Sequence, residues 1–251
     1  MKVIPVSEGV FTVDKTKVFV PFDETKDELQ ARRSGSLLVE VQPFVVITEK
    51  DILLLDTGLG FMKDGEMQLH KNLEANQIKP TDITKVLLSH LHKDHAGGIS
   101  YKDKLGHYHL AFTNAIYYLQ QAEMDFALDT GFPSFMTEEI SILQDNSRVV
   151  FLTEEEGTID GYIQYKVTHA HSPHHQVFWI EEGNEKIFFG ADDAPQLQQM
   201  KHRFIAKYDY DGKKTMELRT QWWREGAEQG WNFLFYHDGK TPVYKSLRFE
   251  V

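Results

Sequence analysis

The chain of 251 residues has no cysteine. It therefore forms no disulfide, binds no metal through thiolates and uses no cysteine nucleophile, although a lack of thiols does not identify the cellular compartment. Long apolar runs are also missing, so we expect no membrane-spanning segment. Residues 1–5 lack the apolar core of a secretory signal, and a cytoplasmic location is the expectation.

Positive charge is scarce in this chain. It carries 27 Lys and Arg against 38 Asp and Glu, which gives a formal net charge of -11. Such a chain repels phosphate backbones, which argues against a nucleic-acid partner and favours a small-molecule substrate. The length fits one sizeable core, and no linker or repeat divides the chain. We therefore predict a single domain over residues 1–251, and leave the oligomeric state open.

Histidine is concentrated in one short segment. His90, His92, Asp94 and His95 lie within six residues, directly after the apolar run 85–89, which predicts a buried strand. Side chains two residues apart project to the same side of an extended chain. His90 and His92 can thus bind one ion while the following turn directs Asp94 and His95 to a second. Imidazole and carboxylate groups are ligands of zinc and related dications.

The HxHxDH run, followed by Ala-Gly-Gly at residues 96–98, resembles the signature of the metallo-β-lactamase superfamily. The resemblance implies an α+β fold, an αββα sandwich in which two sheets lie face to face with helices outside. It also implies a binuclear metal site whose other residues follow further strands. Asp56, after the apolar run 52–55, corresponds to an aspartate that supports the metal loop by hydrogen bonding. An ordinary strand-to-turn aspartate is the alternative.

Residues 168–175 contain four histidines and are similar to the family's third ligand segment. Alignment with that segment makes His171 the ligand and His175 a positioning residue. His169 and His174 stand where the family commonly has proline and glycine. We assign them to the rim of the site or to solvent, with a ligand role as the alternative.

Asp192 and Asp193 follow a further apolar run and compete for the place of the carboxylate between the two ions. Two neighbouring dications repel strongly unless an anion separates them. The family usually has this aspartate directly after Gly or Ala, which favours Asp192. We expect Asp192→Asn to lower metal content and hydrolysis together, and Asp193→Asn to change neither.

His237, at the end of another apolar run, is the last ligand that the resemblance implies. The implied set is His90, His92 and His171 for one ion, Asp94, His95 and His237 for the other, and Asp192 between them. Zinc is the favoured metal, with manganese, iron and cobalt as alternatives, because affinity order and cellular supply both decide occupancy. The remaining histidines are assigned to ordinary structural or surface roles: His70, His107, His109 and His202.

Two such ions imply hydrolysis. A hydroxide held between them would attack a lactone or ester carbonyl, and the same ions would polarise that carbonyl. Asp94 or Asp192 would then pass a proton to the departing alkoxide, and the sequence does not choose between them.

Within the superfamily, the order and spacing of the motifs are most similar to the branch of N-acyl homoserine lactonases, which implies a lactone or ester as substrate. Those lactonases often carry a tyrosine three residues after the bridging aspartate. Pro195 stands at that position here. Tyr208, Tyr210 and Tyr236 are the candidates to replace the missing tyrosine.

Three other functions share parts of this residue set. A thioester hydrolase of the glyoxalase II type has the same ligands, but it usually needs a cationic site for glutathione. A phosphodiesterase has the same metals, but it conflicts with the acidic composition. A non-catalytic, metal-stabilised binding protein is the non-enzyme alternative.

Aromatic residues are candidates for a substrate pocket. Trp222, Trp223 and Trp231 are candidates for an apolar wall, although core packing is the commoner role of such side chains. The segment 126–135 is the better candidate for a substrate-facing loop, because loop aromatics are less readily explained by a core.

Hydrophobic patterning predicts mixed strands and helices along the chain. Residues 37–41 and 44–47 are predicted to form a hairpin that turns at Gln42-Pro43. Helices are expected over residues 65–78, 121–128, 137–143 and 214–229. Further strands are expected over residues 115–119, 149–152, 162–167, 177–181, 186–189 and 244–249, and near Phe233.

Overall fold

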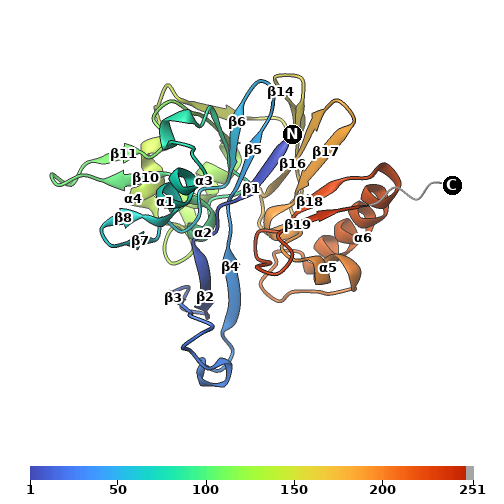
Figure 1. Ribbon diagram of the computed structural model, residues 1–251, viewed down its shortest axis with the longest axis horizontal. Coiled ribbons are helices and arrows are strands. Elements are labelled where there is room, and N and C mark those ends of the chain that lie inside the picture. The colour runs from blue at the N-terminus through green and yellow to red at the C-terminus, as the bar shows by residue number, and fades with distance from the viewer. Residues whose placement is uncertain (247–251) are drawn as a thin grey trace.

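The computed structural model describes residues 1–246, and two six-stranded sheets form its centre (Figure 1). The first sheet contains, in spatial order, β1 (Lys2–Pro5), β5 (Phe44–Ile47), β6 (Ile52–Leu55), β9 (Lys85–Leu87), β12 (Ile116–Gln120) and β13 (Val149–Leu152). The second contains β14 (Glu156–Ile159), β15 (Ile163–Val167), β16 (Gln176–Glu182), β17 (Glu185–Phe189), β18 (Asn232–Leu234) and β19 (Val243–Lys245). Strands β6, β9, β12 and β13 are parallel neighbours, as are β17 and β18.

The alternation of side chains along β6 explains how the sheets pack. Leu53 and Leu55 point between the two sheets and share a buried core with Phe189 of the second sheet. Leu54 points the opposite way, into a core that includes Leu69 of a covering helix. A strand buried on both faces has a continuous apolar sequence, which explains why β6 shows no polar alternation.

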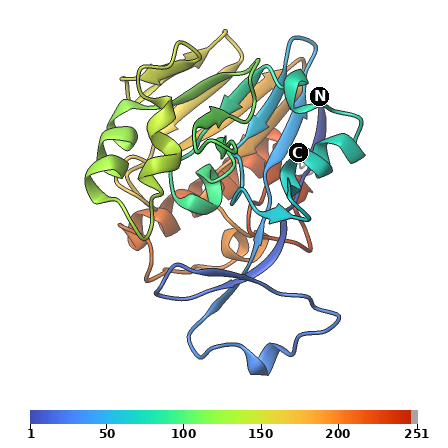
Figure 2. The ribbon, with the colours of Figure 1, turned by 90° about the vertical axis from the view of Figure 1, so that its left-hand side faces the viewer.

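Helices cover the outer face of each sheet (Figures 1 and 2). The first sheet is covered by α1 (Gln68–Ala75), α3 (Gln121–Thr130), α4 (Thr137–Ile140) and η3 (Ser141–Leu143), and the second by α5 (Leu197–Lys201) and α6 (Gly212–Gln229). Trp222 of α6 packs against Phe188 with ring centroids 4.9 Å apart, and Trp231 joins the same core. The layers follow the order helix, sheet, sheet, helix, so the predicted αββα sandwich is confirmed. Core packing of the tryptophans is confirmed too.

A three-stranded sheet projects from the sandwich as a separate arm, residues 9–41 (Figure 1). Its strands are β2 (Gly9–Val13), β3 (Phe19–Pro21) and β4 (Leu37–Val41), in the order β3-β2-β4. The predicted hairpin of residues 37–41 with 44–47 is wrong, because β4 pairs with β2 in the arm while β5 pairs with β1 and β6. Proline cannot adopt the positive φ that tight two-residue hairpin turns use, so the chain passes at Pro43 from one sheet into the other.

Other boundaries differ modestly from the prediction. The helix expected over residues 65–78 is shorter, because the hairpin of β7 (Met62–Lys63) and β8 (Glu66–Met67) takes up its start. The strand expected over residues 244–249 is β19, and residues 247–249 lie outside the described part. The remaining short elements are η1 (Leu29–Ala31), η2 (Pro80–Asp82), α2 (Lys93–Ala96), β10 (Ser100–Lys102), β11 (Tyr108–Leu110) and η4 (Ala191–Asp193).

None of the described helices has the length and apolar character needed to cross a membrane. One domain over residues 1–251 stays a prediction.

Candidate metal centre

The candidate ligands follow strands whose ends meet at one edge of the sandwich. His90 follows β9 in the first sheet. Asp192 and His237 follow the parallel neighbours β17 and β18 in the second. His171 lies in the connection between β15 and β16. Parallel strands end at the same side of a sheet, so their loops bring together residues that are far apart in the sequence.

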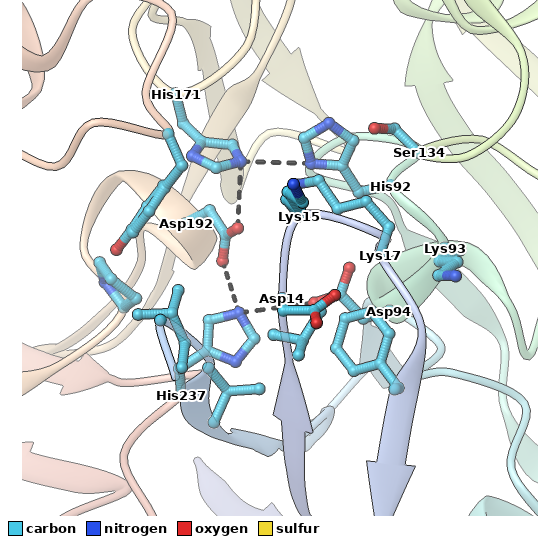
Figure 3. Close-up of a pocket in the computed structure, with 17 residues that line it drawn as sticks. Asp14, Lys15, Lys17, His92, Lys93, Asp94, Ser134, His171, Asp192 and His237 are labelled. Atoms are coloured by element: carbon cyan, nitrogen blue, oxygen red, sulfur yellow. Dashed lines mark hydrogen bonds and ion pairs between the residues drawn. The ribbon is translucent and has the colours of Figure 1, made fainter. Parts of the chain in front are cut away.

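The structure brings all seven predicted ligands together in two adjoining groups. Figure 3 labels the five of them that line the cavity: His92, Asp94, His171, Asp192 and His237. The first group is His90, His92, His171 and Asp192, and the second is Asp94, His95 and His237. Within each group the potential ligand atoms lie within 4.8 Å of one another. This is the division that the sequence implied, and the role of these residues as metal ligands stays a prediction.

Asp192 lies between the two groups. Its Oδ1 is 3.1 Å from Nε2 of His95 and 2.9 Å from Nε2 of His237. Its Oδ2 is 3.1 Å from Nε2 of His171 and 4.0 Å from Nε2 of His90. Each carboxylate oxygen therefore faces a different group, which is the geometry that a bridging ligand requires.

Asp56 holds the HxHxDH loop from behind. Its side chain is fully buried, and its two oxygens accept hydrogen bonds from the N–H and the hydroxyl of Ser89, each at 2.7 Å. Because that hydroxyl already donates to Asp56, it accepts from Nδ1 of His90 at 3.0 Å. Nδ1 of His95 donates directly to Asp56 at 2.8 Å. Asp56 thus orients His90 and His95 with Nε2 facing the centre, as the resemblance implied.

Three ring nitrogens of the first group converge on one point. Nδ1 of His92 lies 2.9 Å from Nε2 of His90 and 3.2 Å from Nε2 of His171. Nδ1 of His171 donates to Asp209 at 3.0 Å and Nδ1 of His90 contacts Ser89, so the Nε2 atoms of both rings are directed into the group. A hydrogen on Nδ1 of His92 can be donated to only one of these two Nε2 atoms, whereas one cation among the three nitrogens would be bound by all of them. The residues present therefore fit a bound dication.

Electrostatics lead to the same conclusion. Burial and neighbouring imidazoles hold the pKa of His90 and His92 well below the usual value, which leaves both in the neutral, metal-binding form. In the second group burial opposes protonation, yet Asp192 and Asp94 raise the pKa of His95 well above its usual value. The carboxylates of Asp192 and Asp94 thus favour positive charge beside them. Two bound dications would supply that charge.

Asp193 has a different role from Asp192. It is fully buried, its Oδ1 accepts from the backbone N–H of His171 at 2.8 Å, and its Oδ2 lies 3.0 Å from Nδ1 of His175. His175, also fully buried, lies behind the site: besides its contact with Asp193, its ring centroid is 4.9 Å from that of His90 and 5.7 Å from that of His171. This changes the expectation that Asp193→Asn would be silent, because Asp193 fixes the backbone from which His171 projects.

His169 lies outside both groups. Its Nδ1 donates to the carbonyl of Pro173 at 2.5 Å, and its Nε2 lies 3.1 Å from Glu155. His174 is not a member of either group within the described residues and lies near His169, with ring centroids 6.1 Å apart. Neither residue therefore belongs to a ligand group of the described chain, and their place at the rim or in solvent stays a prediction.

Sequence reasoning missed Asp209 and Arg219. Asp209 accepts from Nδ1 of His171, and its other oxygen lies 3.4 Å from the guanidinium of Arg219. Arg219, on the buried face of α6, also donates from Nε to the carbonyl of Asp193 at 2.6 Å. An arginine on the inner face of an amphipathic helix was the available signal, because buried charges are nearly always paired.

The glycines of the metal loop allow two backbones to approach closely. A Cβ atom on Gly98 would lie 2.0 Å from the carbonyl oxygen of Thr57, and one on Gly97 would lie 2.3 Å from that of Leu59. Gly97 has an ordinary helical φ of -65°. Glycine is therefore needed at position 97 because the loop after β6 approaches closely. Its backbone conformation would allow other residues.

A cavity of about 450 Å³ opens onto both ligand groups (Figure 3). The arm forms one wall with the apolar side chains of Val13, Phe19, Leu37 and Val39. Tyr208 lines it as well, which distinguishes this residue from the other two candidate tyrosines.

The segment 126–135 contributes little to this cavity. Ser134 lines it, while Phe135 is buried behind His92 with ring centroids 5.1 Å apart, and Phe132 is 74% exposed. No aromatic side chain of this segment lines the cavity, so the substrate-facing aromatic role predicted for it is not found, and Ser134 is the lining residue that it provides.

The sequence profile of the Metallo-beta-lactamase superfamily matches residues 39–204. The chain belongs to this superfamily. The matched residues include the HxHxDH loop, the His171 segment and both aspartates after β17. The resemblance inferred from the sequence is thus confirmed.

Curated relatives of this superfamily member are N-acyl homoserine lactonases. The enzyme of Bacillus cereus is 28% identical over 187 residues, which cover 66% of this chain and 68% of the relative. That of Bacillus thuringiensis is 29% identical over 169 residues, covering 59% of this chain and 61% of the relative. The matches thus leave about a third of each lactonase uncovered.

Solved structures share the fold over nearly the whole chain. A probable metal-dependent hydrolase from Staphylococcus aureus has a TM-score of 0.77 at 22% identity, covering 97% of this chain and 91% of that one. The dizinc quorum-quenching lactonase AidC, in complex with a product, has a TM-score of 0.69 at 20% identity, covering 99% of this chain and 91% of that one.

Proposed function

We propose that the protein is a metal-dependent hydrolase with a binuclear site that cleaves the ester bond of a lactone or ester. The observation that carries the proposal is the position of Asp192, with one carboxylate oxygen directed at each of the two ligand groups. The lactonase relatives support the substrate class.

The metal ligands in this proposal are those of the two groups. His90, His92 and His171 hold one ion, Asp94, His95 and His237 hold the other, and Asp192 joins them. Zinc is favoured because imidazole and carboxylate ligands suit it, and manganese, iron and cobalt are the alternatives. When bound, two dications supply an acidified water as nucleophile and a Lewis acid for the substrate carbonyl.

Proton transfer falls to the two aspartates of the site. Asp94 and Asp192 both line the cavity, so either carboxylate can accept a proton and deliver it to the leaving alkoxide. Asp192 is held by three imidazoles, whereas Asp94 is 3.7 Å from Nε2 of His237 and 3.8 Å from Nε2 of His95. The looser contacts of Asp94 favour it as the group that moves the proton.

Tyr208 replaces the tyrosine that is missing at Pro195. Its phenol lines the cavity, and burial and the charge of Asp192 raise its pKa to about 12, so it stays a hydrogen-bond donor. The hydroxyl of Tyr236 instead donates to the backbone carbonyl of Asp94 at 2.7 Å, and Tyr210 is 69% exposed. These observations support Tyr208, rather than Tyr210 or Tyr236, as the residue that binds a substrate carbonyl oxygen.

Elemental analysis of the purified protein, combined with a substrate panel, tests the proposal. The panel contains lactones, linear esters, thioesters and phosphodiesters, each assayed with metal-loaded and chelator-treated protein. We expect about two metal ions per chain and metal-dependent hydrolysis of lactones or esters. Turnover of thioesters alone would support the glyoxalase II type, and turnover of phosphodiesters alone a phosphodiesterase. Metal binding without turnover of any class would leave a metal-stabilised binding protein.

A further inference from the structure

The mouth of the cavity is lined by lysines, although the protein as a whole is acidic. Lys15 and Lys17 come from the turn between β2 and β3, and Lys93 comes from the HxHxDH loop (Figure 3). Among the described residues, none of these three ammonium groups forms an ion pair with a carboxylate. With a net charge of -11, a chance patch on this surface would more readily be negative.

The one acidic residue that the arm places at this mouth is neutralised. Asp14 forms an ion pair with Arg33 at 2.6 Å, and the hydroxyl and N–H of Thr16 donate to its other oxygen. Asp14 thus shapes the turn and leaves the charges of Lys15 and Lys17 uncompensated. Lys93 is held beside the arm, with its Nζ 5.5 Å from the centre of the Phe19 ring.

Lys17 occupies a backbone conformation that favours other residues. Its φ is 56°, in the left-handed region where glycine and asparagine are most easily accommodated. The turn itself would favour glycine or asparagine at this position. The presence of lysine there is therefore better explained by a role of its charged side chain. Lys17 lines the same cavity as His92 and Asp192, so its side chain shares the space into which the candidate ligands project.

We propose that Lys15 and Lys17 of the arm bind an anionic group on the substrate, so that the preferred substrate is an ester or lactone bearing a carboxylate or a comparable anion. This inference rests on the proposed hydrolase function. The apolar side chains of Phe19, Leu37 and Val39 line the same cavity. An apolar segment between the scissile ester and the anion therefore fits the space between the metal centre and the lysines. Lysine binds anions as a point charge, so it selects for charge more than for shape.

Matched pairs of p-nitrophenyl esters test this inference. Butanoate, hexanoate and octanoate esters are compared with the mono-p-nitrophenyl esters of succinate, adipate and suberate, which have the same chain lengths and end in a carboxylate. The measured quantity is the ratio of kcat/KM for the charged and neutral ester of each pair. We expect a ratio above one for at least one chain length, of roughly tenfold at low salt, and a decrease as sodium chloride is added.

Variants of the two lysines test whether the arm is the source of the preference for the charged ester. Lys17→Asn removes the charge and suits the positive φ, and Lys15→Gln removes the second charge. We expect each to lower the ratio about threefold and the double variant to bring it near one, mainly through KM of the charged ester. Lys26→Asn is the matched control, because Lys26 is an exposed lysine of the same arm paired with Asp23 outside the cavity. It should keep the wild-type ratio.

The outcomes separate the two proposals. Hydrolysis of both esters with a ratio near one at every chain length overturns the inference and leaves the hydrolase function standing. A ratio above one that survives in the double variant also overturns it, since the arm would not be its source. Failure of metal-loaded wild type to cleave either ester of any pair, together with failure on the lactones of the substrate panel, overturns the proposed function itself. Thermal unfolding of each variant shows that the fold is retained.

Discussion

Nδ1 of His171 donates a hydrogen bond of 3.0 Å to Asp209, a residue 38 positions later in the chain. Asp209 is in turn held by Arg219, whose side chain is 1% exposed. The same guanidinium binds the carbonyl of Asp193, whose carboxylate holds the backbone N–H of His171. One buried arginine on α6 therefore fixes both the backbone and the ring of a candidate metal ligand.

Replacing Asp209 tests this arrangement. Asp209→Ala removes the acceptor that fixes the His171 ring, and we expect metal affinity to fall about 10- to 100-fold, as for other partners of metal-bound histidines. The measurement is a competition titration against a chromogenic chelator. Asp129→Ala, at an exposed position of α3, is the control. Equal affinity in both variants would show that Asp209 does not support the metal site.

The two neighbouring aspartates should respond differently to the same change. Asp192→Asn should lower metal content and hydrolysis together, because the bridging charge is lost. Asp193→Asn should lower the free energy of unfolding by about 1–3 kcal/mol, because His175 and the N–H of His171 lose a buried charged acceptor. Elemental analysis and denaturant unfolding of both variants provide the measurements. Normal metal content in Asp192→Asn would assign the bridge to another residue.

Tyr208→Phe should affect turnover more than metal binding. Loss of one hydrogen-bond donor to the reacting carbonyl is expected to lower kcat roughly 10- to 100-fold, with metal content unchanged. Because the pKa of Tyr208 is about 12, the phenol stays protonated as pH rises to 10, and the wild type should show no loss of kcat from this group in that range. Tyr210→Phe is the control. If both variants keep wild-type kcat, Tyr208 does not contact the carbonyl.

Gly98→Ala should destabilise the protein. The added methyl would lie 2.0 Å from the carbonyl oxygen of Thr57, so the loop that carries the HxHxDH ligands has to shift. We expect the free energy of unfolding to fall by more than about 2 kcal/mol, with reduced metal binding. Gly161→Asn is the control, because nothing lies within 4 Å of its Cβ position and asparagine tolerates its positive φ. Wild-type stability of Gly98→Ala would contradict the close approach.

Metal removal should lower thermal stability. Bound cations would be held by ring nitrogens of His90, His92 and His171 that converge on one point, so chelation is expected to decrease the melting temperature. Bound ligand at about 1,000 times its Kd contributes about 4 kcal/mol per site, which sets the scale of the loss. Calorimetry before chelation, after it and after zinc addition gives the result. A melting temperature that does not respond to chelator or zinc would argue against a resident metal.

The sequence alone determined the parts of this protein that depend on neighbouring residues. The HxHxDH run follows a buried strand within a few residues, so His90, His92, Asp94 and His95 were recognisable together. Apolar runs at 52–55, 186–189 and 231–236 placed Asp56, Asp192 and His237 at strand ends for the same reason. The layered fold followed from the family resemblance that these motifs carry.

Only the tertiary structure decided which distant residues meet. Pairing of β4 with β2 instead of β5 creates the arm, and that pairing brings Lys15 and Lys17 to the mouth of the cavity. Packing of α6 against the second sheet brings Arg219 to Asp209 and Asp193. Such contacts depend on how strands and helices assemble over long sequence separations. Local patterns of polarity specify an element and its buried face, and they do not specify the element against which that face will pack.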